Sequence, residues 1–165
     1  EGIAHQTRPA PAAPAPEGLP DWEDVRSAIL GEPKREGPLE VRDCDPESGD
    51  PTVLKPAYRR IWMRARGEVP DDPLIHMAVL VFATDRTLLS TAARPHGLTW
   101  SRRMGASLDH AVWVHHPPRW DGWLLYESES PAASHARALV LGAIYDARGQ
   151  RIASVAQEGV LREAR

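Results

Sequence analysis

Cysteine and long apolar runs are the two features that this 165-residue sequence most plainly lacks. The one cysteine, Cys44, cannot form an internal disulfide, and no second cysteine completes a CxxC motif. Proteins of reducing compartments have this character, so we expect a cytoplasmic location. No uninterrupted run of about 18 apolar residues is present, so we expect no membrane partner.

An excess of charge of one sign is also missing, because 20 Lys and Arg residues stand against 23 Asp and Glu residues, for a net charge of −3. The two signs are interspersed, whereas chains that bind nucleic acid or anionic membranes carry blocks of positive charge. We therefore expect a small molecule or another protein as the partner, and no nucleic acid. The length favours a single domain.

Motifs for metal, nucleotide and covalent serine chemistry are absent. His115 and His116 are adjacent, so a strand would point them to opposite faces, and there is no H-E-x-x-H motif. There is also no glycine-rich phosphate loop. Ser107 does not lie in a G-x-S-x-G elbow, which argues against a serine nucleophile. We expect no metal, no cofactor and no covalent serine mechanism.

Proline and alanine dominate the start of the chain. Residues 8–20 lack a hydrophobic period, and their composition is typical of an extended, polyproline-like linker. A short helix is predicted between Asp21, a good N-cap, and Gly31, a good C-terminal stop. We expect residues 1–35 to form a linker with a short helix that adds little to the core, and residues 36–165 to form the folded domain.

One long apolar segment lies among strand-like ones in this domain. Residues 73–89 are apolar on almost every side, and Asp72 followed by Pro73 supplies an N-cap, so we predict a helix that is buried all round. Strand patterns cover residues 39–42, 60–66, 106–115, 123–129, 137–146 and 150–162. A buried helix followed by long antiparallel strands predicts an α+β architecture in which the sheet curls around the helix, a hotdog fold.

Gln157 is out of place in the last predicted strand. Alternation puts its side chain on the same face as Val155 and Leu161, which is the small and apolar face. A buried carboxamide must have its hydrogen bonds met, since each unmet bond costs about 1–3 kcal/mol. Gln157 is therefore a candidate for holding a water molecule or a carbonyl group.

Asp85 and Ser107 are the two other polar residues at notable positions. Asp85 lies near the end of the apolar helix, where a buried carboxylate is costly. Two alternatives stay open for it: an ion pair with Arg86 or Arg94 at the surface, or a place facing a site. Ser107 is predicted near the start of a strand, where alternation gives it the same face as Trp113.

The chain also carries six ordered motifs: Pro70-Asp-Asp-Pro73, Phe82-Ala-Thr-Asp-Arg86, Arg94-Pro-His-Gly97, Ser107-Leu-Asp-His-Ala111, Trp123-Leu-Leu-Tyr-Glu-Ser-Glu-Ser-Pro131 and Ala153-Ser-Val-Ala-Gln-Glu-Gly159. Together they resemble the C-terminal half of the acyl-CoA thioesterase II family, which hydrolyses fatty acyl-CoA with a double hotdog. The resemblance runs from about Glu1 to Arg162.

The resemblance implies a site and a substrate. The family's Asp on the central helix, Thr or Ser on the following strand and Gln on the last strand match Asp85, Ser107 and Gln157. It implies a water molecule held by all three and aimed at the thioester carbonyl of acyl-CoA, with no acyl-enzyme. The expected activity is hydrolysis to a free fatty acid and CoA.

The chain departs from the family in lacking its first hotdog. We therefore expect a homo-oligomer, or pairing with another hotdog domain, to complete the pocket. One alternative is a non-catalytic subunit that binds acyl-CoA or serves assembly. A second is a hotdog dehydratase, which would need a His and acid dyad on the central helix. His76 is on that helix, but near its start and with no suitable acid after it.

Overall fold

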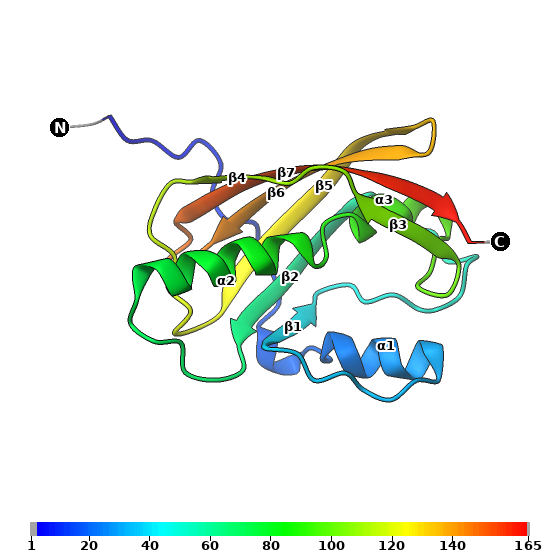
Figure 1. Ribbon diagram of the computed structural model, residues 1–165, viewed down its shortest axis with the longest axis horizontal. Coiled ribbons are helices and arrows are strands. Elements are labelled where there is room, and N and C mark those ends of the chain that lie inside the picture. The colour runs from blue at the N-terminus through cyan, green and yellow to red at the C-terminus, as the bar shows by residue number, and fades with distance from the viewer. Residues whose placement is uncertain (1–2, 165) are drawn as a thin grey trace.

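The computed structural model describes residues 3–164 and contains one seven-stranded antiparallel sheet (Figure 1). The strands are β1 Leu39–Asp43, β2 Tyr58–Ala65, β3 Arg103–Ser107, β4 Ala111–Val114, β5 Leu124–Ser134, β6 Arg137–Tyr145 and β7 Arg151–Glu163. Their order is β1-β2-β5-β6-β7-β3, and β4 also pairs with β7. The sheet curls around a central helix without closing into a barrel, so the predicted α+β hotdog fold is confirmed.

The central helix, α2 (Pro73–Asp85), begins where the sequence predicts it. Asp72 caps it by accepting a hydrogen bond from Leu74 N at 2.8 Å. The helix ends at Asp85 instead of Leu89, because the chain turns there and places Leu88 in the core with no exposed surface. Two short elements follow, α3 Ser90–Ala93 and the 3-10 helix η2 Arg94–His96.

The prediction that α2 is buried all round is wrong. One side of the helix packs on the sheet through residues such as Leu80 and Ala83, which have no exposed surface. The other side carries exposed apolar side chains: Leu74 (78%), Ile75 (38%), Val81 (45%) and Phe82 (46%). Figure 1 shows why, since the sheet lies behind α2 and no described element covers its outer side. By length and composition alone, the helical run Pro73–His96 would suffice to cross a membrane.

The strand predicted over residues 106–115 is two strands, β3 and β4, joined by a β-bulge. Ser107 pairs with Gly159, but Ala111 pairs with Ala156, so three residues stand opposite two residues of β7. One extra residue reverses the alternation of faces. Ser107 is therefore the last residue of β3, and it does not share a face with Trp113, which is exposed.

The remaining strand predictions are close. Their ends lie within two residues of the observed ends, apart from the end of β5. That strand continues to Ser134, five residues further than predicted, through a register shift between Glu129 and Ala132. Strand ends depend on partners across the sheet as well as on local sequence, which explains why this extension had no local signal.

The N-terminal segment lies against the sheet. The Gln6 side chain accepts a hydrogen bond from Arg151 N at 2.8 Å and donates one to Gly149 O at 2.9 Å. Trp62 Nε1 donates to Pro14 O at 2.8 Å. Ala10 and Ala13 pack on a small apolar cluster of Leu125, Ala143 and Tyr145. The segment is thus extended, as predicted, and held at the surface of the sheet.

Helix α1 (Trp22–Leu30) follows a short 3-10 helix, η1 (Pro16–Gly18). Both predicted end signals of α1 are confirmed: Asp21 accepts from Glu23 N, and Gly31 has a positive φ of 66°. The expectation that this region adds little to the core is wrong for Trp22. Its side chain is buried in the main core, where Arg59 stacks on its ring and Trp100 meets it edge to face.

Candidate active site

Asp85, Ser107 and Gln157 come together from three different elements. Asp85 is the last residue of α2, Ser107 is the last residue of β3, and Gln157 lies in the middle of β7. Gln157 Nε2 is 2.5 Å from Asp85 Oδ1 and 2.6 Å from Ser107 Oγ, and Ser107 Oγ is 3.1 Å from the same Asp85 oxygen. The three side chains therefore form a closed hydrogen-bonded triangle.

The hydrogens of this triangle can be assigned. Gln157 Nε2 carries two hydrogens and donates one to Asp85 Oδ1 and one to Ser107 Oγ. Ser107 thus accepts from Gln157 and gives its single hydrogen to Asp85. Asp85 Oδ1 receives two hydrogen bonds, and no donor among the described residues reaches its second oxygen, Oδ2, so Oδ2 is available to a ligand.

Gln157 has bonding capacity left. Its side chain has no exposed surface, and among the described residues its Oε1 has no hydrogen-bond partner. Asp85 does not form either of the ion pairs considered for it, because Arg86 pairs with Glu23 and Arg94 with Asp45. The carboxylate of Asp85 is instead hydrogen-bonded to Ser107 and Gln157, so the ion-pair alternative is wrong.

Close packing holds β3 and β7 against the turn that follows α2. A Cβ atom on Gly159 would lie 2.7 Å from Leu89 Cδ1, and one on Gly105 would lie 3.1 Å from Leu89 Cδ2. Glycine at these positions allows the Leu89 side chain to pack closely on one face of the paired strands. This contact sets the distance between the end of the helix and the strands that carry Ser107 and Gln157.

Tyr126 supports the last turn of α2 beside the site, a role that was not predicted from the sequence. Its ring is fully buried, and its hydroxyl donates to Thr84 O at 3.2 Å in the last turn of α2. Burial, together with the negative charge of Asp85, holds the pKa of Tyr126 well above its usual value. The hydroxyl therefore stays protonated and remains a donor to the helix.

Two open hollows meet at Asp85 and Ser107. The first measures about 410 Å³, and its apolar wall consists of Val81, Phe82 and Leu108. The second measures about 330 Å³, and its lining includes Leu89, Trp100, Arg103 and Leu161. A substrate with one apolar arm and one polar arm can thus reach the triangle from the surface.

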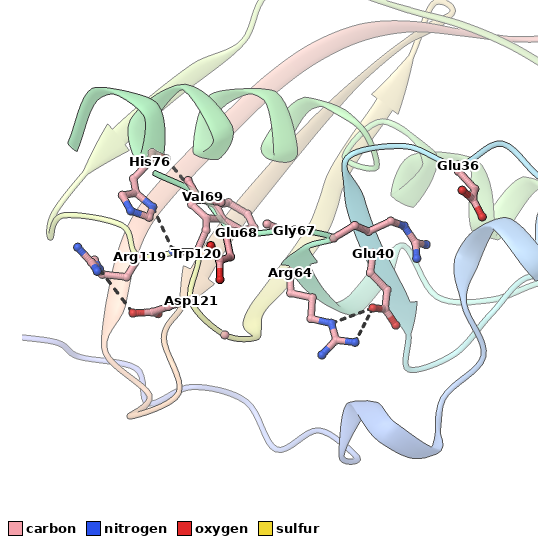
Figure 2. Close-up of a pocket in the computed structure, with 13 residues that line it drawn as sticks. Glu36, Glu40, Arg64, Gly67, Glu68, Val69, His76, Arg119, Trp120 and Asp121 are labelled. Atoms are coloured by element: carbon pink, nitrogen blue, oxygen red, sulfur yellow. Dashed lines mark hydrogen bonds and ion pairs between the residues drawn. The ribbon is translucent and has the colours of Figure 1, made fainter. Parts of the chain in front are cut away.

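The largest hollow, about 780 Å³, lies elsewhere, near the start of α2 (Figure 2). Several of its charged side chains have partners, such as Arg64 with Glu40 and Arg119 with Asp121. His76 lines it, but its Nδ1 accepts from Trp120 N at 3.3 Å and the ring is buried. His76 Nε2 has no hydrogen-bond partner among the described residues, so this hollow also holds an unused polar atom. Because three polar side chains from distant elements bond to one another at the other end of the helix, we place the candidate site there.

Metal ligation finds no support among the described residues, where no three His, Cys, Asp or Glu side chains lie close enough together to hold an ion. The two adjacent histidines bind separate partners. His115 Nε2 lies 2.6 Å from Ser154 Oγ, and His116 Nε2 lies 3.1 Å from Gln150 Nε2. The chemistry of the triangle rests on oxygen and amide groups.

The chain is similar in sequence to known acyl-CoA thioesterases. A family model described as Acyl-CoA thioesterase matches residues 50–160. Acyl-coenzyme A thioesterase 8 of Mus musculus is 34% identical over 167 residues, which cover 92% of this chain and 52% of the mouse protein. Acyl-CoA thioesterase 2 of Haemophilus influenzae is 31% identical over 172 residues, which cover 98% of this chain and 60% of that protein.

Solved structures agree with this assignment. The acyl-CoA thioesterase II TesB2 from Mycobacterium marinum has a TM-score of 0.77 and 35% identity, covering 99% of this chain and 59% of that chain. A protein of unknown function with a hot dog fold from Alicyclobacillus acidocaldarius has a TM-score of 0.71 at 16% identity, which supports the fold alone. The chain spans about half the length of the curated relatives it matches. It belongs to the acyl-CoA thioesterase family.

Proposed function

We propose that this chain hydrolyses acyl-CoA thioesters with a water molecule activated by Asp85 and held by Ser107 and Gln157. The observation that carries the proposal is the closed triangle, with distances of 2.5 to 3.1 Å between side chains from α2, β3 and β7. Membership of the acyl-CoA thioesterase family supports the substrate class.

The proposed reaction is a direct attack of water on the thioester. Water attacks the thioester carbonyl carbon and passes a proton to Asp85 Oδ2, since Oδ1 is already occupied by two donors. The bond from carbon to sulfur then breaks, and the CoA thiolate takes up the proton. The products are a carboxylic acid and free CoA.

Ser107 is poorly arranged to act as the nucleophile. Gln157 donates a hydrogen to its Oγ, which lowers the nucleophilicity of that oxygen, and Ser107 does not lie in a G-x-S-x-G elbow. Water activation by a placed carboxylate contributes roughly 10²–10⁴-fold in rate, and hydrogen bonds to a developing oxyanion a comparable factor. No covalent intermediate is needed to reach useful rates.

The test is thiol release from acyl-CoA by the purified chain across a series of chain lengths, combined with a rapid acid quench and intact-mass measurement. We expect thiol release at a steady rate and no acyl adduct on the protein. The proposal fails if the chain releases no thiol, or if the quench traps an acyl group on Ser107.

A second candidate function is a non-catalytic subunit that binds acyl-CoA or serves assembly. It is favoured by one observation, namely that the two hollows at Asp85 and Ser107 are open to the surface. Binding of acyl-CoA by calorimetry without any thiol release would support this candidate over hydrolysis. The same assay series therefore decides between the two functions.

We also propose that a second hotdog unit, in the simplest case another copy of this chain, covers the outer side of α2. The support is the row of exposed apolar side chains on that side, which continues onto Leu108 beside the site. Exposed apolar patches of this kind are usually covered in soluble proteins. Light scattering at micromolar concentration should give a dimer or larger. A strictly monomeric mass, with no binding of a dye for exposed apolar surface, would contradict it.

A further inference from the structure

The β-bulge between β3 and β4 lies directly opposite the site. Leu108, Asp109 and His110 stand across from only two residues of β7, Gln157 and Glu158. Bulges occur often beside active sites, where they turn a side chain to a new direction. The two polar residues of this bulge each make a contact next to a member of the triangle.

Asp109 binds the strand that carries Gln157. Its Oδ1 accepts a hydrogen bond from Glu158 N at 2.7 Å. On the other side of the same residue, Glu158 O accepts from Leu108 N at 2.9 Å. The bulge would otherwise leave Glu158 N without its ladder partner, so the Asp109 carboxylate replaces a backbone acceptor one residue from Gln157.

His110 binds the helix that carries Asp85. Its Nε2 lies 2.8 Å from Thr84 Oγ1, and Thr84 is fully buried in the last turn of α2. The hydroxyl of Thr84 gives its one hydrogen to Val81 O at 2.9 Å, so Oγ1 must accept and His110 Nε2 must donate. The imidazole thereby fixes the residue that directly precedes Asp85.

We propose that Asp109 and His110 are positioning residues that hold Gln157 and Asp85 in register, each through the neighbour of the residue it places. Consecutive residues of one bulge thus join β7 to the end of α2 across the triangle. Neither side chain hydrogen-bonds to Asp85, Ser107 or Gln157, so both act by fixing backbone position. This inference rests on the proposed function, and its test separates the two.

The test uses the full chain with Asp109→Ala and His110→Ala, and with the conservative variants Asp109→Asn and His110→Gln. Each alanine variant should lower kcat about 10- to 100-fold with KM changed by less than about 3-fold, since small misplacements of catalytic groups have effects of this size. Asn at position 109 keeps an acceptor for Glu158 N, and Gln at position 110 keeps a donor for Thr84 Oγ1. The conservative variants should therefore retain most of the parent kcat.

A matched control lies at the other end of β7. Asp146 Oδ1 also accepts backbone N–H groups, from Arg148 at 2.9 Å and Gln150 at 2.8 Å, but it is far from the triangle. Asp146→Ala should lower the melting temperature as Asp109→Ala does while leaving kcat unchanged. In a Gln157→Ala background, Asp109→Ala should lower kcat no further, because residues that act through one another are not additive.

A readout independent of turnover keeps the inference testable even in a chain without activity. The side-chain amide signals of Gln157 in a ¹⁵N spectrum, identified by their loss in Gln157→Ala, should shift in Asp109→Ala and His110→Ala but not in Asp146→Ala. Unchanged signals would overturn the inference whether or not the chain is an enzyme. Normal kcat in both alanine variants of an active chain would overturn it as well, while absent thiol release in the parent chain defeats only the proposed function.

Discussion

The two ends of helix α2 differ in a way that explains where the site lies. At the start of the helix, the larger hollow is rimmed by charged side chains, several of which form ion pairs, as Arg64 does with Glu40 (Figure 2). At the other end, two smaller open hollows meet at Asp85 and Ser107, and both of these side chains are hydrogen-bonded to the buried Gln157. The convergence of polar side chains from separate elements marks the site better than volume does.

The contrast also separates two uses of polar groups. Ion pairs around His76, such as Arg64 with Glu40, contribute to stability. The triangle at Asp85 instead concentrates its bonds on one carboxylate oxygen and leaves the other open. Substitutions at the Asp85 end of α2 should therefore change turnover, whereas changes in the other regions should alter stability.

A large effect on turnover is expected for Gln157→Ala. The substitution removes both hydrogens that hold Asp85 and Ser107, so turnover should fall on the order of 10²-fold through lost positioning. Steady-state kinetics with acyl-CoA measure it, with the melting temperature as a control for folding. Retention of the parent kcat would show that the triangle does not act as the site.

A smaller loss is expected for Ser107→Ala. The hydroxyl gives one hydrogen bond to Asp85, and a second water molecule can often replace such a bond, so kcat should fall by only about 10-fold. The same assay measures the change. A complete loss of activity would instead point to Ser107 as a nucleophile.

Deletion of residues 1–14 should affect stability and leave the site alone. The segment buries few apolar groups, but it makes hydrogen bonds through Gln6 and Pro14. We expect a loss of about 1–2 kcal/mol, which corresponds to a melting temperature lower by about 3–8 °C for a chain of this size. An unchanged melting temperature would show that the contact with the sheet is not maintained in solution.

The smallest effect is expected for Glu40→Gln, at the edge of the large hollow. Burial raises the pKa of Glu40, but the hydrogen bonds and charges of Arg42 and Arg64 outweigh it and leave the pKa below the usual 4.5. A lowered folded pKa adds stability above the unfolded pKa, and this stability is lost as the pH falls through the folded value.

The Glu40→Gln variant should therefore melt about 2–4 °C lower at neutral pH, for a loss of about 1 kcal/mol with partly exposed arginine partners. The difference from the parent should shrink in acid, and kcat should stay the same. Thermal melts from pH 7 to pH 3 measure it, and a difference that grows as the pH falls would contradict the assignment.

Local signals in the sequence were enough for the hotdog fold and for the polar residues of the site. The Asp72 cap and Pro73 located the start of α2, and the alternation around Gln157 identified a buried amide, because both features depend on near neighbours along the chain. The convergence of Asp85, Ser107 and Gln157 came only from resemblance, since it depends on contacts between distant elements.

Three features had no local signal. The bulge at Asp109 arises from the register of β3 and β4 on β7, and it overturned the predicted faces of Ser107 and Trp113. The sequence of α2 is apolar on almost every side, as in a fully buried helix. Apolar composition alone does not show which sides of a helix are covered by other elements. The attachment of the N-terminal segment depends on backbone oxygens such as Pro14 O meeting Trp62, which no pattern of side chains encodes.

The most direct test of the central claim compares Asp85→Asn with His76→Asn, at the two ends of α2. Asp85→Asn keeps the shape and removes the negative charge, so kcat should fall roughly 10²–10⁴-fold with substrate affinity almost unchanged. His76→Asn should leave kcat within about 3-fold of the parent, with any cost appearing in the melting temperature. Hydrolysis by Asp85→Asn at near the parent rate, or an equal loss in His76→Asn, would contradict the account.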